Sequence, residues 1–547
     1  MSSVAAILAF GGALFCSFAG WGRIAAWLLR VTVAWSPRGP LSSLGLAAVL
    51  AIFAALNAAH ALVPAAYALL FGIGLAGFAV GVPRWVAAAR REGVPFVRRS
   101  GLVLLALVLA LPAMTSSLDS PGYNRHDDAH AYMLAVKRVL DTGTIGSDPF
   151  NFRLTAAGAG ATATLQAPAV ALFGWRAIWV VDQGVGMLLL LAALFHFSGR
   201  RQVRWPMVVA MLVGFFGLCV RDIANVTSFY LTLALLLALS ELLAERDDRS
   251  CGTGIVIGLM LAALAAMKYT PLPLALLLVA ATLIRHRPWD WRERAKQATS
   301  ILLACGLPLL LWYAPHFGRA AMLLPLEHGS GPDQVSAGYL IWWTFTAPDL
   351  LMTLGPWAAL LVLGLLAIVA LRGREERLEA LALVGVVAAG CLATTWLTGG
   401  VSSTRFNRPL VLFACLVAGV LFGGHGFAYR RQRLLALLAV IGAFALCRNV
   451  DTPLIPWHDW SRAGAALSNP LPRTPPAAQL DAARRLQEAM PPGSSALVWT
   501  DRPFLLDFAR DRLFVVDYPF AAGPRPGLWR CRDVICQSDA LREKAVR

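Results

Sequence analysis

The chain has 547 residues, of which 58% are hydrophobic and only 14% are charged. Its mean hydropathy is +0.63, and runs such as LLALVLALPAM and LTLALLLALSELL approach the ~18 apolar residues that indicate a membrane span. This composition excludes an ordinary soluble protein and indicates a polytopic integral membrane protein. The net charge of +17 fits nucleic-acid binding in principle. The basic residues fall between apolar runs, however, where the positive-inside rule places them, so we expect no nucleic-acid partner.

In chain order, the apolar runs predict about fourteen membrane-spanning helices. The N-terminal run has no basic segment before it, so we expect a first span and not a cleaved signal peptide. The predicted ranges are 3–21, 41–62, 64–83, 101–117, 176–197, 205–220, 223–243, 252–268, 270–285, 298–316, 349–371, 378–398, 409–424 and 434–448.

The basic residues between these spans predict which side of the membrane each loop faces. Clusters such as Arg90–Arg91, Arg200–Arg201 and Arg430–Arg431 all fall on one side, which the positive-inside rule makes cytoplasmic. The opening residues, the loop around 317–345, the loop TGGVSSTRFNRP and the tail from 449 then face outward. If the apolar stretch 157–174 crossed the membrane, the later arginine clusters would face the outer side. We therefore expect this stretch to form an interfacial or re-entrant segment on the outer face.

We divide the chain into N-terminal helices (1–116), a first large outer loop (117–175), a transmembrane core (176–448) and an outer C-terminal domain (449–547). In the tail, AAQLDAARRLQEAM has helical periodicity, whereas SALVWT and RLFVVDY are typical of strands. The expected fold class is therefore an all-α polytopic membrane protein of about 12–14 transmembrane helices with a small α/β C-terminal domain. Cys531 and Cys536 lie in this tail, where an oxidising compartment would allow a disulfide. No zinc or haem spacing occurs.

One outer stretch, RHDDAHAYMLAVKRVLDTGTIGSDP at 125–149, concentrates polar residues. Repulsion between the adjacent carboxylates of Asp127 and Asp128 can raise the pKa of one of them, so that one acts as a base while the other orients a ligand or cation. The alternative for the pair is a helix cap, which is a common role of Asp. The next residues predict an amphipathic interfacial helix. Its apolar side holds Ala131, Leu134, Ala135 and Leu140, and its polar side holds Lys137, Arg138 and Asp141.

The acidic pair, the AxxY pattern after it and the helix that follows, DDAHAYMLAVKRVLDTGTIGSDPF, resemble the GT-C superfamily of membrane glycosyltransferases. This superfamily includes the protein O-mannosyltransferases, the aminoarabinose transferases and the oligosaccharyltransferases. The segments MKYTPL, SSTRFNRPLVLF and PPGSSALVWTDRPFLLDFARDRLFVVDYP are similar to uncharacterised bacterial members. The chain departs from the family pattern in having several spans before the acidic loop, which usually follows the first span.

The resemblance implies an inverting glycosyltransferase in the bacterial inner membrane, a multi-pass protein whose active site faces the periplasm. It implies a polyprenyl-phosphate sugar as donor, with membrane lipid around it, and a glycan, lipid or protein as acceptor. No nucleotide-sugar donor is expected on that face. The sequence has neither a Walker loop nor a GxGxxG motif between a strand and a helix.

The reaction assigns roles to particular residues. Asp127 or Asp128 is the expected catalytic base, which takes the proton of the acceptor hydroxyl. A departing phosphate needs positive charge and no general acid. Arg405 is the leading candidate for that charge, because arginine binds phosphate bidentately, and Arg408 and Lys268 are further candidates. Snorkelling toward the membrane surface is the alternative role for Arg405 and Lys268.

A further group of polar residues is predicted to contact the acceptor or the sugar: Asp148, Arg153, His130, Tyr132, Glu327 and His328. Asp148 equally fits a turn before Pro149, and for residues 327 and 328 a mobile, solvated loop is the default interpretation. His130 follows Asp128 closely, but a lone DDxH pattern is weak evidence for a metal. We therefore assign no metal ligand and leave a divalent cation as an open alternative.

Other classes of membrane protein fit the composition. A transporter or flippase of lipid-linked saccharide is one, an O-antigen polymerase or ligase is another, and an assembly protein is a third. Transporters place ionisable groups near mid-membrane and contain repeated halves. In this chain the spans look almost bare of charge and the polar residues gather at the outer boundary, which favours the transferase.

Overall fold

The fold is described from a computed structural model. The residues it describes are 4–31, 40–92, 101–111, 128–146, 148, 151, 159–219, 227–244, 251–285, 291–314, 350–371, 373–397, 403–424, 430–447, 475, 477–498, 500 and 502–515.

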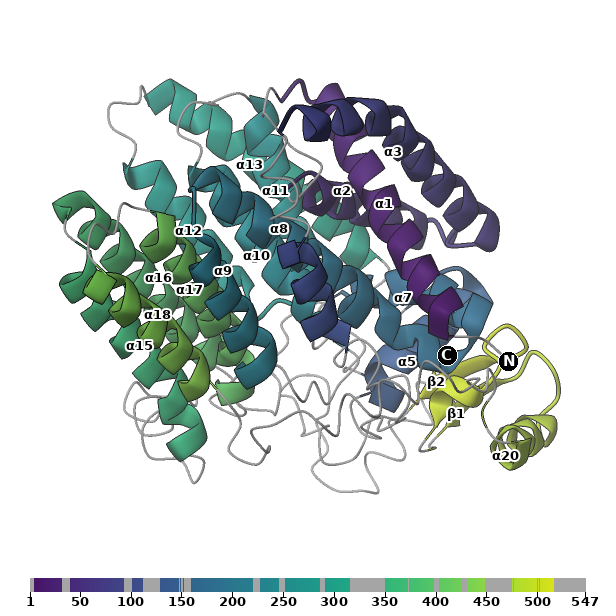
Figure 1. The fold of residues 1–547 in the computed structure, drawn as a ribbon. Helices are drawn as coiled ribbons and strands as arrows, with labels where there is room; N and C mark the ends of the chain where they lie inside the picture. Colours follow the sequence, from purple (N-terminus) through teal and green to yellow (C-terminus); the bar gives the residue numbers. More distant parts are fainter. Residues whose placement is uncertain are drawn as a thin grey trace.

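The described chain is predominantly helical, and its apolar helices run side by side as a bundle (Figure 1). Seven described helices are long and apolar enough to cross a membrane, and shorter apolar helices of 10–17 residues accompany them. The bundle helices are α1 (Val4–Leu28), α2 (Pro40–Ala58), α3 (Pro64–Glu92), the helix Gly101–Leu111, α8 (Met187–Arg200), α9 (Trp205–Leu212), α10 (Phe229–Ala244), α11 (Cys251–Met267), α12 (Leu272–Arg285), α13 (Trp291–Tyr313), α15 (Leu350–Ala370), α16 (Arg374–Leu397), α17 (Ser403–Gly424) and α18 (Arg430–Leu446).

Every predicted span overlaps one of these helices, so the apolar runs were correctly interpreted as helical. The helices that carry basic residues at one end are longer than the apolar runs predicted. For example, α3 continues to Glu92 and α13 begins at Trp291. An apolar pattern ends at the first charges, whereas backbone hydrogen bonding continues the helix beyond them.

The first three helices pack unusually closely through glycine. A Cβ atom added to Gly22 in α1 would lie 1.7 Å from the carbonyl oxygen of Leu41 in α2. A Cβ on Gly45 of α2 would lie 1.7 Å from the carbonyl oxygen of Phe18, and one on Gly20 would lie 1.7 Å from that of Gly74 in α3. Small residues of this kind let helix backbones approach each other in a membrane.

These contacts also show which helix ends lie together. The late residue Gly22 of α1 meets the start of α2, so α1 and α2 are antiparallel. The start of α11 meets the end of α1, because a Cβ on Gly252 would lie 2.4 Å from the carbonyl oxygen of Leu29. The end of α11 at Met267 therefore points toward the same end of the bundle as the end of α2 at Ala58.

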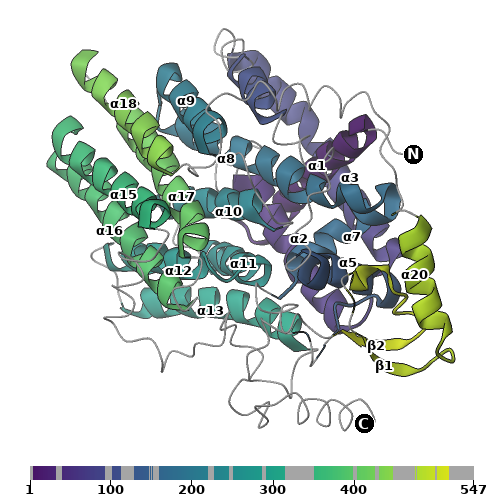
Figure 2. The same ribbon diagram turned by 90° about the horizontal axis from the view of Figure 1, so that it is seen from below.

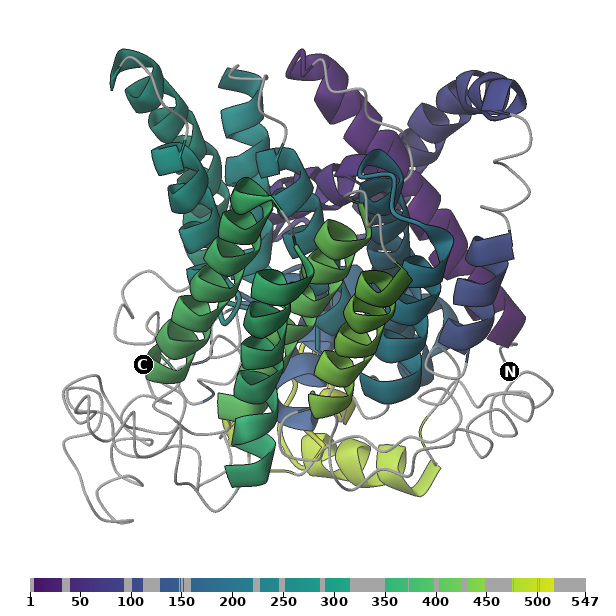
Figure 3. The same cartoon turned by 60° about the vertical axis from the view of Figure 1, so that its left-hand side comes forward.

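A segment between the first helices and the core lies at this end of the bundle. It contains the π-helical turn η1 (Asp128–Tyr132), α5 (Met133–Thr142) and α7 (Ala161–Phe173). The side-chain oxygen of Asn57, near the end of α2, accepts hydrogen bonds from the Thr144 hydroxyl at 3.0 Å and the Ile145 amide at 2.9 Å. We call this the α5 end of the bundle; Figures 1 and 3 show it at the bottom.

The segment expected to be interfacial or re-entrant forms α7, and Ala161 to Val170 are all buried. α7 packs against α5, α11 and the 3₁₀ turn η2 (Trp175–Trp179). Burial in protein on all sides fits a re-entrant segment and does not fit a helix lying among lipid headgroups. The chain then continues through the π-helical turn η3 (Val180–Gly186) into α8, and η4 (Val213–Cys219) similarly extends α9.

The predicted tail helix and both predicted strands are present in the C-terminal lobe, which we define as the described residues between 477 and 515. It contains α20 (Ala477–Glu488), β1 (Ser495–Val498), the short turn η9 (Pro503–Leu505) and β2 (Arg512–Val515). The strands pair in parallel, with Ser495 opposite Arg512 and Val498 opposite Val515. Figure 2, viewed from below, shows the lobe beside α5 and α7. Cys531 and Cys536 lie outside the described residues.

Candidate functional site

The described candidate residues fall into two groups at the α5 end of the bundle. Asp128, His130, Tyr132 and Asp148 belong to η1, α5 and the residues after them, whereas Lys268 and Arg408 belong to the end of α11 and the start of α17. Arg405 lies in the first turn of α17, so its backbone is close to Arg408. The candidates that fall outside the described residues are Asp127, Arg153, Glu327 and His328.

The acidic group begins with Asp128, which opens η1 and is fully buried at 0% exposure. A carboxylate at the start of a helical turn is favoured by the backbone dipole. His130 is also buried, and its carbonyl oxygen accepts a hydrogen bond of 2.8 Å from the Asn151 side-chain amide. Tyr132 is half-buried. Asp128 therefore belongs to a packed turn.

Asp148 joins α5 to the C-terminal lobe. Its Oδ2 atom accepts hydrogen bonds from Arg138 Nη2 at 2.5 Å and from the Val515 amide of β2 at 2.8 Å. Arg138 was predicted on the polar side of an interfacial helix, and the structure buries its guanidinium under the lobe. Leu140, predicted on the apolar side, is instead partly exposed.

Other contacts strengthen the same junction. Arg138 also donates to the Leu513 carbonyl at 3.3 Å, and its guanidinium lies 5.0 Å from the centre of the Phe508 ring. One oxygen of Asp141 accepts from the Phe508 amide at 2.9 Å, and the other pairs with Lys137 at 2.7 Å. Burial lowers the pKa of Arg138, and the charge of Asp148 and its hydrogen bond oppose that shift. The polar side of α5 is thus the surface on which the lobe docks.

The basic group converges on the start of α10. Lys268, directly after α11, lies with its Nζ atom 3.3 Å from the Thr227 hydroxyl and 5.4 Å from the centre of the Phe406 ring. A cation over an aromatic face is attracted by the ring quadrupole. Phe406 belongs to α17, two residues before Arg408. The fold thus brings two predicted phosphate-binding cations, which are far apart in the sequence, to neighbouring helix ends.

Hydrogen bonds from α16 hold both the loop after Lys268 and the first turns of α17. The Thr394 hydroxyl donates to the Thr270 carbonyl at 2.8 Å, two residues after Lys268. The Asn407 side-chain amide donates to the Thr395 hydroxyl at 2.8 Å, next to Arg408. Neighbouring residues of α16 therefore position the Lys268 loop and the first turns of α17 relative to each other.

Asp182, in η3, belongs to the same region and was missed in the sequence. It is buried, and its two oxygens accept hydrogen bonds of 3.0 Å from the amides of Phe229 and Leu231 in the first turn of α10. It also interacts electrostatically with Lys268. The available signal was a lone acid in the apolar run VVDQGVG, because an ionisable residue inside a span is unusual enough to indicate function.

α7 connects the acidic and basic groups. It packs against α5, which continues from Asp128, and also against α11 and η3, which carry Lys268 and Asp182 toward α10. Both groups therefore lie toward the α5 end of the bundle. Within the described ranges, no three His, Cys, Asp or Glu residues are grouped so as to hold a metal ion.

Comparisons with protein-family models, with curated proteins and with solved structures return no match for this chain. A functional interpretation therefore depends on the residues and contacts of the chain itself.

Proposed function

We propose that the protein is an inverting glycosyltransferase, which moves a sugar from a polyprenyl-phosphate carrier to an acceptor at the periplasmic face of the bacterial inner membrane. The proposal rests mainly on the positions of Lys268 and Arg408, which lie near the start of α10. The buried Asp128 of η1 lies toward the same end of the bundle. The resemblance of the acidic stretch to the GT-C superfamily supports the same reaction.

In the proposed reaction, the Asp128 or Asp127 carboxylate accepts the proton of an acceptor hydroxyl. The acceptor oxygen forms a bond to the anomeric carbon while the bond from that carbon to the phosphate oxygen breaks. The electron pair of the broken bond leaves with the polyprenyl phosphate. Lys268 and Arg408, with Arg405 in the same turn of α17, stabilise the negative charge that develops on that phosphate. One displacement of this kind inverts the anomeric configuration.

A flippase or transporter of lipid-linked saccharide is the second candidate, and specific contacts favour it. Asp182 is buried in the apolar bundle within the electrostatic influence of Lys268, and His196 Nε2 lies 2.9 Å from the buried Glu241 Oε1 between α8 and α10. The spans are therefore less bare of charge than the sequence suggested. Ionisable groups inside a membrane domain often mark a transport pathway.

The experiment that separates the two candidates uses the purified protein in vesicles, with labelled polyprenyl-phosphate sugars and candidate acceptors. Wild type is expected to transfer sugar, and Asp128→Asn or Asp127→Asn to lower the rate by about 100-fold or more, which is typical of losing a general base. Lys296→Gln is the control, because Lys296 is exposed and pairs with Glu293 at the surface. Normal transfer by both aspartate variants would contradict the assigned base. Movement of intact lipid between leaflets without cleavage would support the flippase.

A further inference from the structure

Tyr230, in the first turn of α10, carries a buried hydroxyl that no sequence motif singles out. The residue has 0% exposure, and its hydroxyl has no hydrogen-bond partner within the described part of the chain. Buried tyrosine hydroxyls usually find a partner, because an unpaired polar atom away from water costs free energy. The Tyr230 hydroxyl therefore has an unmet donor, which the anionic oxygen of a ligand can accept where cations lie nearby.

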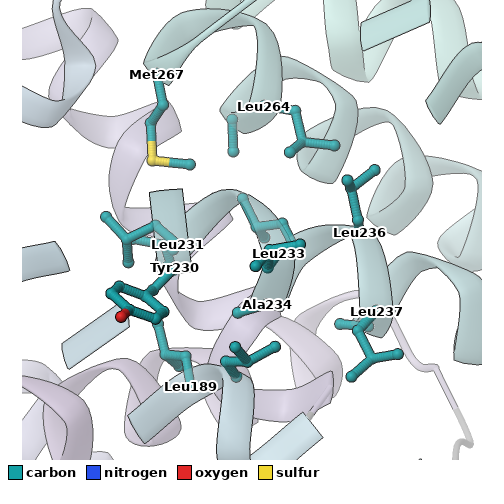
Figure 4. Close-up of a cluster of buried hydrophobic side chains, with 14 of the residues drawn as sticks. Leu189, Tyr230, Leu231, Leu233, Ala234, Leu236, Leu237, Leu264 and Met267 are labelled. Carbon is teal, nitrogen blue, oxygen red and sulfur yellow. The ribbon is translucent and has the colours of Figure 1, made fainter. Parts of the chain in front are cut away.

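The aromatic neighbours of Tyr230 fix the direction of its hydroxyl. The Phe229 ring lies edge-on with its centre 5.2 Å from that of Tyr230, and the Phe215 ring lies edge-on at 6.2 Å. Figure 4 shows the hydroxyl on the side of the ring opposite Leu233 and Ala234, with Leu231 and Leu189 close to the ring. The ring is thus held mainly by apolar contacts.

The start of α10, which carries Tyr230, lies beside the basic group, because Lys268 Nζ is 3.3 Å from the hydroxyl of Thr227. Asp182 and Arg408 both interact electrostatically with Tyr230, and Lys268 interacts with Asp182. Both oxygens of Asp182 are already bound to the amides of Phe229 and Leu231. Arg408 and Asp182 are therefore the charges that act on Tyr230, and the Asp182 carboxylate is committed to the backbone of α10.

Ser228, two residues before Tyr230 in the chain, carries a second orphaned hydroxyl. It is 1% exposed, and its Oγ atom has no partner among the described residues. Ser228 precedes the first helical residue of α10, where a serine normally caps the helix by accepting from an amide of the first turn. Asp182 takes the Leu231 amide from a different segment, which leaves the Ser228 hydroxyl without its usual role.

We propose that the hydroxyls of Tyr230 and Ser228 donate hydrogen bonds to a phosphoryl group that Lys268 and Arg408 hold by charge. The identity of that group as the phosphate of a polyprenyl lipid rests on the proposed function. Neutral donors suit such a site, because they bind anionic oxygens strongly without adding a charge to the membrane interior.

The test compares Tyr230→Phe with Tyr67→Phe. Tyr67 is the matched control: it is buried in α3 beside Phe53, its hydroxyl also lacks a partner within the described chain, and no charged group among those residues acts on it. Each variant loses one hydroxyl and no ring. The full-length protein is reconstituted in nanodiscs, and binding of undecaprenyl phosphate is measured by titration, with thermal unfolding recorded alongside.

We expect Tyr230→Phe to weaken binding of the lipid phosphate about 10-fold, as the loss of a charge-assisted hydrogen bond does, while Tyr67→Phe binds like wild type and both unfold normally. Wild-type affinity in Tyr230→Phe, or an equal loss in both variants, would overturn the proposal. Inorganic phosphate is titrated in parallel. If it binds in a Tyr230-dependent manner while the lipid does not, the site belongs to free phosphate and the lipid assignment is wrong.

The same measurements separate this proposal from the proposed function. Tyr230-dependent binding of undecaprenyl phosphate by a protein that transfers no sugar would uphold the phosphoryl site and contradict the glycosyltransferase. If Tyr230→Phe transfers sugar at the wild-type rate and with wild-type donor affinity, the glycosyltransferase would be upheld and the phosphoryl site contradicted.

Discussion

Arg138 and Asp148 form a buried ion pair, with 2.5 Å between Nη2 and Oδ2, that fastens the C-terminal lobe to α5. The same oxygen of Asp148 accepts from the amide of Val515, which lies 367 positions further along the chain. Because α5 continues directly from the turn that carries Asp128, the lobe and the candidate base are attached to one rigid element. The docking of the lobe thus bears on the geometry of the acidic group.

Removing one member of this pair should release the lobe. Asp148→Ala leaves the buried Arg138 without its carboxylate, and breaking a buried pair in this way typically costs about 3–5 kcal/mol. We expect faster amide hydrogen exchange in β2 (Arg512–Val515), with little change in the bundle helices. The double variant Arg138→Met with Asp148→Leu should recover part of the protection, because it leaves no unpaired charge. Unchanged exchange at Val515 in Asp148→Ala would contradict the docking role.

We predict that Asp182, and not Ser228, caps the N-terminus of α10. An N-terminal capping serine usually contributes about 0.5–2 kcal/mol, yet Ser228→Ala should leave the unfolding temperature nearly unchanged, because Asp182 occupies the Leu231 amide. Asp182→Ala should lower it clearly, since the part-buried Phe229 amide and the buried Leu231 amide lose their acceptor. Thermal unfolding of the two variants in the same detergent makes the comparison. A larger effect from Ser228→Ala than from Asp182→Ala would reverse the assignment.

The close approach of α1 and α2 makes a glycine substitution a sharp test of packing. Gly22→Ala places a Cβ 1.7 Å from the Leu41 carbonyl oxygen, so the helices must move apart, and we expect a loss of about 1–3 kcal/mol. Gly12→Ala in the same helix meets nothing within 4 Å and should be neutral or slightly stabilising. Denaturation of the two variants in matched micelles checks the difference, and equal stabilities would argue against this packing.

The two ends of the bundle are predicted to face opposite sides of the membrane. Glu488 of the lobe and Lys296 at the start of α13 are both exposed. A membrane-impermeant maleimide added to intact spheroplasts should therefore label Glu488→Cys and not Lys296→Cys, in a background without native cysteines. Permeabilised cells should label both variants. The opposite pattern would place the acidic group in the cytoplasm.

The sequence predicted most of the bundle because each membrane helix leaves a local signal, an apolar run that ends at charges. The tail helix α20 and both strands were also found from local periodicity. The burial of Arg138 was not found, because α5 shows only that one side is polar, and the covering strand lies hundreds of residues away.

The candidate site was predicted in part for the same reason. Lys268 and Arg408 stood out as cations beside apolar runs, and the fold brings their helices together. Asp182 and Tyr230 did not stand out, because an acid and a tyrosine within apolar runs acquire meaning only when η3 packs against the start of α10.

The anomeric configuration of the product tests the central claim most directly. The purified protein is given a polyprenyl-phosphate sugar of known anomeric configuration and an acceptor, and the linkage formed is determined by NMR. A single displacement assisted by an aspartate base predicts an inverted linkage in wild type, with its formation lost in Asp128→Asn or Asp127→Asn. A retained linkage, or recovery of the intact donor lipid under every acceptor tried, would contradict the account.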